Sequence, residues 1–152
     1  MATTSTIPAF KTALVTAIAT AMPGVQVAYR WPGPSTKPRG VYLGDTDGTQ
    51  ELASIVARDT RAPRNERYEL QLFCHTYHVG QDPITGPADA EADAFSLLAE
   101  VEDVLADDPT VGSAAGVASW SFLTSLRPEL EPFEKGWRCR LTAVLQVTAR
   151  LT

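Results

Sequence analysis

Cysteine and histidine are scarce in this sequence, with two of each among 152 residues. Two cysteines, Cys74 and Cys139, cannot build the disulfide framework that staples many small secreted domains. Both fall in expected strands, so we expect two buried, unbridged thiols in a protein that folds in a reducing compartment. The segment CHTYH places Cys74 and His78 on one strand face and His75 on the other, whereas zinc needs three or four converging ligands. We therefore expect no metal and no cofactor.

Long apolar runs and catalytic signatures are missing as well. No stretch approaches the roughly 18 uninterrupted apolar residues of a membrane span, and no charged-then-apolar leader opens the chain, so neither a membrane nor a secreted protein is expected. There is no glycine-rich phosphate loop and no G-x-S-x-G elbow. The segment DTDG at 45–48 begins like a calcium loop, but its twelfth position is Val56 and not glutamate, so we expect a turn. Asp89 and Asp93 fall on the outer face of an expected helix, so no enzyme is expected.

Positive charge is absent from the middle of the chain. Residues 68–126 contain no Lys or Arg but ten acidic residues, and the formal net charge is −5. Nucleic-acid-binding proteins usually show a basic face, so sequence-specific binding of nucleic acid is not expected. The acids either form a solvated helix face or present a negative surface to a partner, and the sequence leaves both open.

The composition, 44% hydrophobic and 20% charged, is that of a globular protein. The length corresponds to one domain, residues 1–152. The first expected element is a helix whose apolar residues recur at three- and four-residue steps: Ile7, Phe10, Leu14, Ile18 and Met22. We expect Thr6 to cap this helix, Pro8 to sit in its first turn, and Pro23 and Gly24 to end it.

Alternation of apolar and polar residues predicts the strands. They are expected at residues 25–31, 41–45, 50–57, 66–79, 117–129 and 137–151. The proline-rich residues 32–40 are expected to form a loop. A second, acidic helix is expected between Pro87 and Pro109, with this apolar stripe: Ala94, Leu97, Leu98, Val101, Val104 and Leu105.

This order of elements predicts an α+β fold, a largely antiparallel β-sheet with two helices packed on one face and a terminal β-hairpin. Residues 137–151 alternate strictly, and we expect them to pair with residues 117–129 and with residues 66–79. Their apolar odd-numbered face should lie under the helices. Their polar face carries Arg138, Arg140, Thr142, Gln146, Thr148 and Arg150.

Three features are candidate interfaces. An arginine-rich segment, residues 58–67, is expected to be an exposed, mobile loop that is either simply solvated or contacts phosphates or carboxylates of a partner through Arg58, Arg61, Arg64 and Arg67. Trp31, beside a stiff Pro-Gly-Pro loop, is either an interface anchor or a cap on a hydrophobic edge. The polar face of the last strand, with Arg138, Arg140 and Arg150, could pack against the acidic helix of a neighbouring subunit.

The order of these segments and their residue composition resemble those of a known family. A first helix closed by MPG, a Pro-Gly loop, VYLGD, ERYELQLFCHTY, an acidic helix ending at DDP, and the terminal GWRCRLTAVLQVTARL resemble the tail terminator (minor tail) proteins of long, non-contractile-tailed bacteriophages. The resemblance implies an α+β subunit of a homohexameric ring in the virion. Such a ring caps the tail tube, ends tail growth, and joins the tail to the head connector. Its partners would be the tail tube protein and the head completion protein, with DNA passing through without sequence-specific binding.

The resemblance transfers no role to any single residue, and other functions stay open. Another head–tail joining protein would share a small α+β domain. A small ligand-binding domain or enzyme, using the sheet face and CHTYH, is the alternative from a different class. Acidic and basic residues kept in separate stretches suit a heterologous contact, in which unlike surfaces meet and a ring closes.

Overall fold

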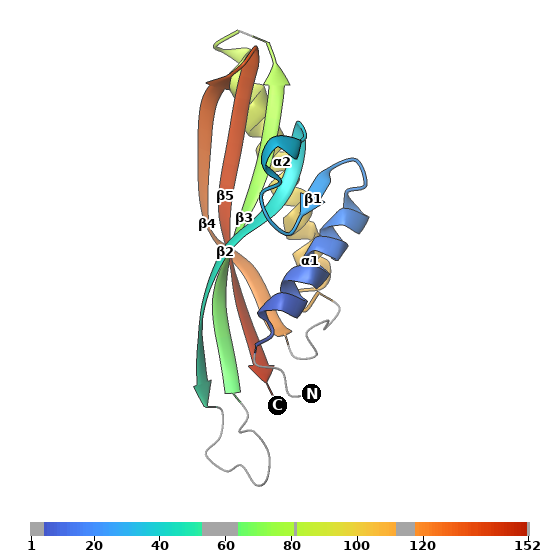
Figure 1. Cartoon of the computed structure of the whole chain (residues 1–152), viewed down its shortest axis with the longest axis vertical. Helices are drawn as coiled ribbons and strands as arrows, with labels where there is room; N and C mark the ends of the chain where they lie inside the picture. The colour runs from blue at the N-terminus through green and yellow to red at the C-terminus, as the bar shows by residue number, and fades with distance from the viewer. Residues whose placement is uncertain (1–4, 53–63, 81, 112–117, 152) are drawn as a thin grey trace.

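Five strands form one sheet, and two helices lie against one of its faces (Figure 1). The computed structural model describes residues 5–52, 64–80, 82–111 and 118–151. The described elements, in chain order, are α1 (Ile7–Ala21), β1 (Gln26–Ala28), a short 3-10 turn (Gly33–Ser35), β2 (Arg39–Leu52), β3 (Arg64–Val79), α2 (Thr85–Asp107), β4 (Ala118–Phe133) and β5 (Gly136–Leu151). The sheet order is β1-β2-β3-β5-β4, and all neighbours are antiparallel except the parallel pair β1 and β2. The predicted α+β class and the terminal hairpin are confirmed.

Strand β5 is long because it pairs along its length with two other long strands. It runs antiparallel to β3 on one side and to β4 on the other. Buried and more exposed residues alternate along it, and every odd-numbered residue from Cys139 to Leu151 is buried. The predicted apolar face of this strand therefore faces the helices, as expected from its strict alternation.

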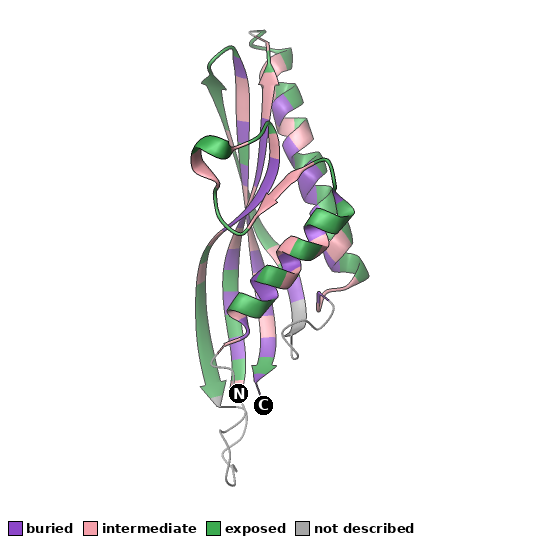
Figure 2. Cartoon of the chain, turned by 45° about the vertical axis from the view of Figure 1, so that its right-hand side comes forward, coloured by how far each residue is buried: buried purple, intermediate pink, exposed green. Residues whose placement is uncertain are grey.

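The core lies between the helices and this face of the sheet (Figure 2). Helix α2 contacts β3, β4 and β5, and α1 contacts α2 and β1. Both predicted apolar stripes are buried, apart from Ile7 and Val104, which are only partly covered. In β3, the even-numbered side chains from Tyr68 to Cys74 enter the core, as the alternation predicted.

Two predictions at the N-terminal end are wrong in detail. Thr6 occupies the N-cap position of helix α1, as predicted, but its side chain makes no capping hydrogen bond to the helix. Its hydroxyl instead donates to the carboxylate of Glu66 at 2.8 Å, because that carboxylate is buried beside it and needs donors. Strand β1 covers only Gln26–Ala28, shorter than the predicted residues 25–31, since the chain turns away into the proline-rich segment.

The segment DTDG is not a turn. Strand β2 continues through it, and residues 46–52 pair with residues 64–70 of β3 after a bulge between Leu43 and Thr46. A bulge inserts an extra residue without ending the strand, so the polar sequence is accommodated by the ladder itself. Strand β3 likewise begins at Arg64, so Arg64 and Arg67 belong to a strand and not to the predicted loop. The remainder of that predicted loop, including Arg58 and Arg61, lies outside the described residues.

The hairpin of β4 and β5 turns on two residues only. Glu134 and Lys135 connect Phe133 to Gly136, and Glu134 has a φ of 51°, in the left-handed region that tight hairpin turns use. Gly136 lies so close to β3 that a Cβ there would approach the carbonyl oxygen of His78 to 2.0 Å. None of the described helices is long and apolar enough to span a membrane.

Candidate functional site: the open face of the sheet

The sheet face away from the helices collects the predicted tryptophan and two of the predicted arginines. The odd-numbered residues of β3 pair with the even-numbered residues of β5, so His75 stands opposite Arg140, and Tyr77 opposite Arg138. Neither helix covers this face (Figure 1). Trp31, from the segment after β1, folds over it.

Trp31 is packed and exposed at the same time. Its ring meets Tyr42 edge-on with centroids 5.0 Å apart and His75 with centroids 5.4 Å apart, yet 40% of the residue remains exposed. Offset and edge-on aromatic pairs of this kind stabilise a fixed ring orientation. Trp31 is therefore a rigid aromatic surface on the sheet and covers His75 on the inner strand β3.

Two adjacent hollows meet at this tryptophan. One, of about 370 Å³, lies between the proline-rich segment and the tip of the β4–β5 hairpin, and Tyr77 and Phe133 form part of its wall. The other, of about 320 Å³, extends along β4 over Glu129 and Glu131. Both are lined by Trp31, His75 and Arg138, so they adjoin at these residues, and we call the two hollows together the groove.

His75 at the floor of this groove is held neutral. The residue is 4% exposed, and its ring nitrogens have no hydrogen-bond partner of ordinary geometry among the described residues. Burial lowers the pKa of His75, and the nearby charges of Arg138 and Arg140 lower it further, whereas the backbone of Lys37 acts in the opposite direction. The sequence placed His75 on this face but offered no signal that it would be buried there.

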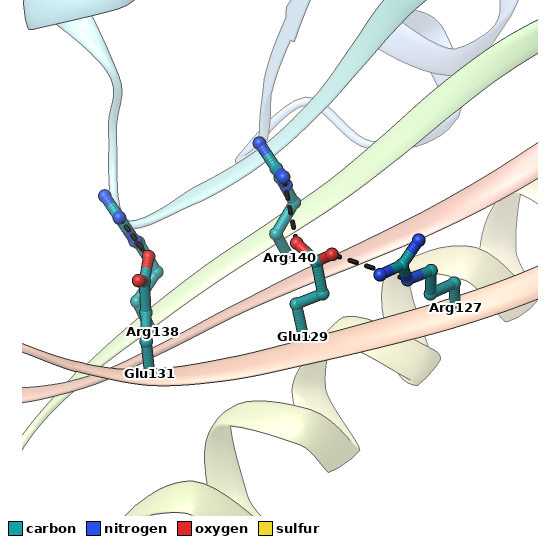
Figure 3. Close-up of polar contacts among 5 residues, drawn as sticks. All are labelled: Arg127, Glu129, Glu131, Arg138 and Arg140. Carbon is teal, nitrogen blue, oxygen red and sulfur yellow. Dashed lines mark hydrogen bonds and ion pairs between the residues drawn. The ribbon is translucent and has the colours of Figure 1, made fainter.

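Arg138 and Arg140 are already paired within the chain. Arg138 donates from Nε to a carboxylate oxygen of Glu131 at 2.7 Å, and Arg140 donates from Nη2 to Glu129 at 2.9 Å (Figure 3). Glu129 also lies 3.5 Å from Arg127, so it sits between two guanidinium groups. The arginines also stack over rings, Arg138 over Phe133 at 4.3 Å and Arg140 over Phe73 at 5.6 Å.

These cross-strand pairs follow from the hairpin register, which the sequence pattern did not predict. The turn at Glu134 and Lys135 places Glu131 opposite Arg138 and Glu129 opposite Arg140. If the turn is assigned to all six residues of EPFEKG, the pairing of glutamates on β4 with arginines on β5 cannot be recognised. Because these ion pairs already neutralise the two arginines within the chain, the arginines are less available to a neighbouring subunit than the sequence alone suggested.

Of the remaining predicted arginines, the three that the structure describes do not join this groove. Arg64 bonds to Gln50 at 2.6 Å and points to the helix side of the sheet, like its neighbour Glu66 two positions along. Arg67 lines a separate hollow with Asp47, Glu69 and Gln146. Arg150 lies on the same face as Arg138 but twelve residues along β5, or about 40 Å away at ordinary strand rise.

The second histidine lies on the other face of the sheet and ties α2 to it. His78 Nε2 is 3.1 Å from Asp93, whose carboxylate also binds Arg39 through contacts of 2.9 and 3.1 Å. Asp93 is therefore engaged by the sheet and does not simply face solvent, which corrects the expectation from helix periodicity. Cys74 shares this strand face but lies four residues from His78, about 13 Å along the strand, too far for a thiol–imidazole pair.

The two cysteines are buried, as predicted, and their thiols are free. Burial raises the pKa of Cys74 to about 12 and that of Cys139 to about 11, which leaves little reactive thiolate at neutral pH. Within the described residues there is no group of three or more His, Cys, Asp or Glu side chains that could hold a metal ion. The open face carries aromatic side chains and arginines, residue types that are enriched at protein interfaces.

Comparison with known proteins supports the fold alone. No protein-family model matches the chain, and no curated protein matches it. A chain in the solved structure described as "Virion of native gene transfer agent (GTA) particle" matches it with a TM-score of 0.55. The match covers 97% of this chain and 99% of that chain, at 15% sequence identity.

Proposed function

We propose that this protein is a structural subunit of a phage-like virion, and that it acts as a tail terminator. In this role, copies assemble into a ring, with six subunits expected, that caps the finished tail tube and then joins the tail to the head connector. The ring leaves a channel for DNA and binds no specific sequence. The subunit performs no chemistry and belongs at the neck end of the tail.

The observation that carries the proposal is the end-to-end likeness in fold to a chain of a virion particle. Both chains are covered almost completely, so the likeness extends over nearly the full length of each chain and not over a common fragment. The order of segments in this sequence resembles tail terminators independently of that match. A further support is the stiff sheet, whose three long strands β3, β4 and β5 suit a part that must hold its shape under load.

Deletion of the gene in its phage or prophage tests the role directly. Without a terminator, polymerisation of the tube has no end point, so electron micrographs should show tails of irregular, excessive length and heads without tails. Complementation with the wild-type gene should restore both. Tails of normal length that still fail to join heads would instead indicate a head–tail joining protein. Normal, joined tails in the deletion strain would refute both roles.

A further inference from the structure

One flank of the molecule exposes more large apolar side chains than a solvated surface requires. Strand β4 pairs only with β5, so its other edge is free within the described residues. Four large apolar residues lie along this flank with 36 to 50% of their surface exposed: Phe95, Phe122, Leu126 and Leu130. Leu126 and Leu130 pair with the core-facing Ala143 and Cys139, so they point to the helix side of the sheet but are not covered there.

Helix α2 supplies the other side of this flank. Glu102 and Ala106 line a hollow of about 430 Å³ together with Leu105, Phe122 and Leu123. Phe95 precedes Glu102 by seven residues, two helical turns, and therefore lies on the same stripe of α2. We call this surface the β4–α2 seam, defined by Phe95, Glu102, Ala106, Phe122, Leu126 and Leu130.

A further β-strand cannot pair regularly with the free edge of β4 at residues 128–132. Pro128 and Pro132 lie in β4 and have no N–H to donate. Prolines on an edge strand are a common device against strand addition. A partner at residues 128–132 must therefore contact side chains and not continue the sheet.

The opposite edge of the sheet carries a surface of complementary character. Tyr29 is 41% exposed beyond the end of β1, and Lys11 Nζ sits 4.2 Å from the centre of its ring. The side chain of Arg30 is 79% exposed and reaches Asp45 only at 3.9 Å. We call this surface the β1 corner, defined by Lys11, Tyr29 and Arg30.

The charges of the two surfaces are opposite. Arg30 is the exposed cation of the β1 corner, facing the single carboxylate of Asp45, whereas Lys11 is only 8% exposed and lies against the Tyr29 ring. At the seam, Glu102 forms no ion pair with any residue that the structure describes. Unlike charges around an exposed tyrosine and an apolar hollow are the pattern of an interface with an apolar centre and a polar rim.

We propose that the β4–α2 seam of one copy receives the β1 corner of a second copy. Tyr29 enters the hollow beside Phe122, and Arg30 meets Glu102. The inference rests on the ring proposed above and identifies the two surfaces that build it. Since the surfaces differ and lie at opposite edges of the sheet, the contact is heterologous, each subunit uses both, and the chain of contacts can close.

Cysteine cross-linking of the full-length protein tests this contact. Arg30→Cys and Ala106→Cys place one thiol in each surface, leave Tyr29 unchanged and alter the hollow only by one sulfur atom at residue 106, and the native thiols are buried. Under mild oxidation, a mixture of the two variants should give a disulfide-linked dimer, whereas neither variant alone should. A chain that carries both substitutions should give a ladder of linked species. Val79→Cys, which is 78% exposed outside both surfaces, is the matched control partner for Ala106→Cys and should give no product.

Charge exchange provides the second arm. Arg30→Glu should lower the yield of association by about two- to fivefold, the effect of an exposed ion pair, and Glu102→Arg on the partner should restore it. A cross-link in Ala106→Cys alone would mean a symmetric contact and would overturn the inference. So would the absence of a cross-link in the mixture. If rings are nevertheless visible in micrographs, the proposed function survives this failure, whereas normal tails in the deletion strain would remove the function itself.

Discussion

Glu66 is a buried carboxylate that anchors the start of helix α1 to the sheet, and we expect Glu66→Gln to destabilise the protein measurably. The residue is 2% exposed and lies in β3. One carboxylate oxygen accepts hydrogen bonds of 2.8 Å from the N–H and the hydroxyl of Thr6. The other accepts from the hydroxyl of Ser5 and from the amide of Gln50.

The magnitude follows from the number of donors. Glutamine has nearly the same shape but offers one oxygen and one NH₂ group, so two of the four donors around residue 66 lose their acceptor. Hydrogen bonds to a charged group contribute about 1.5–3 kcal/mol each, and some of the loss is recovered when hydroxyls rotate. We expect a decrease of about 2–4 kcal/mol in the free energy of unfolding at pH 7.

The pH dependence gives a second, independent signature. Burial alone would raise the pKa of Glu66, but the hydrogen bonds from Ser5 and Thr6 outweigh it, so the pKa falls below its ordinary value of 4.5. A lowered folded-state pKa adds stability above the unfolded pKa, and that contribution is lost as the pH falls through the folded value. The difference between wild type and Glu66→Gln should therefore shrink steadily below about pH 4.5.

Urea unfolding followed by tryptophan fluorescence, at one low protein concentration so that association does not add stability, measures both effects. Glu69→Gln is the matched control, because Glu69 is exposed on the opposite face of the same strand and should change stability by less than about 0.5 kcal/mol. Equal stability of Glu66→Gln and wild type would refute the anchoring role. A difference that stays constant from pH 7 to pH 3 would refute the assignment to the ionised carboxylate.

Three further predictions concern the core, the hairpin and the open face. Thiol titration should find almost no reaction at Cys74 and Cys139 in the folded protein and two thiols per chain in denaturant; no thiols in denaturant would indicate a disulfide or a bound metal. Gly136→Ala should destabilise by about 1–3 kcal/mol in urea unfolding, because the new Cβ collides with the backbone of β3, and an unchanged midpoint would contradict this. Trp31→Ala should raise the pKa of His75 by exposing its ring, as NMR titration can follow, and an unchanged value would show that Trp31 is not the cover.

The sequence predicted the fold class because its long elements carry strong periodicity. In β5 and in α2 the apolar residues recur over many positions, so the period and the buried face are both clear. The prediction from sequence failed where a short polar segment forms part of a strand because a neighbouring strand pairs with it. DTDG resembles a turn by composition, yet β3 offers a long partner edge, and β2 continues through a bulge. Propensity is a weak prior when a neighbouring strand supplies the hydrogen bonds.

The candidate site was predicted only in part, since it depends on register. Sequence patterns placed Trp31, His75 and the arginines of β5 as exposed or polar-face residues, but they could not show that Trp31 folds across two strands onto His75. The glutamates of β4 lie opposite the arginines of β5 only when the turn is assigned to two residues. A one-residue error in a hairpin moves every side chain to the other face, so such pairs are lost with the register.

The ion pairs on the open face also change where a neighbouring subunit is to be sought. Net charge along the sequence suggested that Arg138 and Arg140 would meet a neighbour's acids, but each already has a glutamate on β4. A partner that used them would have to displace Glu131 and Glu129. The free energy of a new exposed ion pair is too small to drive that displacement. Glu102 of α2, by contrast, forms no ion pair within the described part of the chain, and it lines a hollow together with Leu105 and the exposed Phe122. Charge that is not neutralised within the fold, next to apolar surface that the fold leaves exposed, is the better guide to an interface than charge counted along the chain.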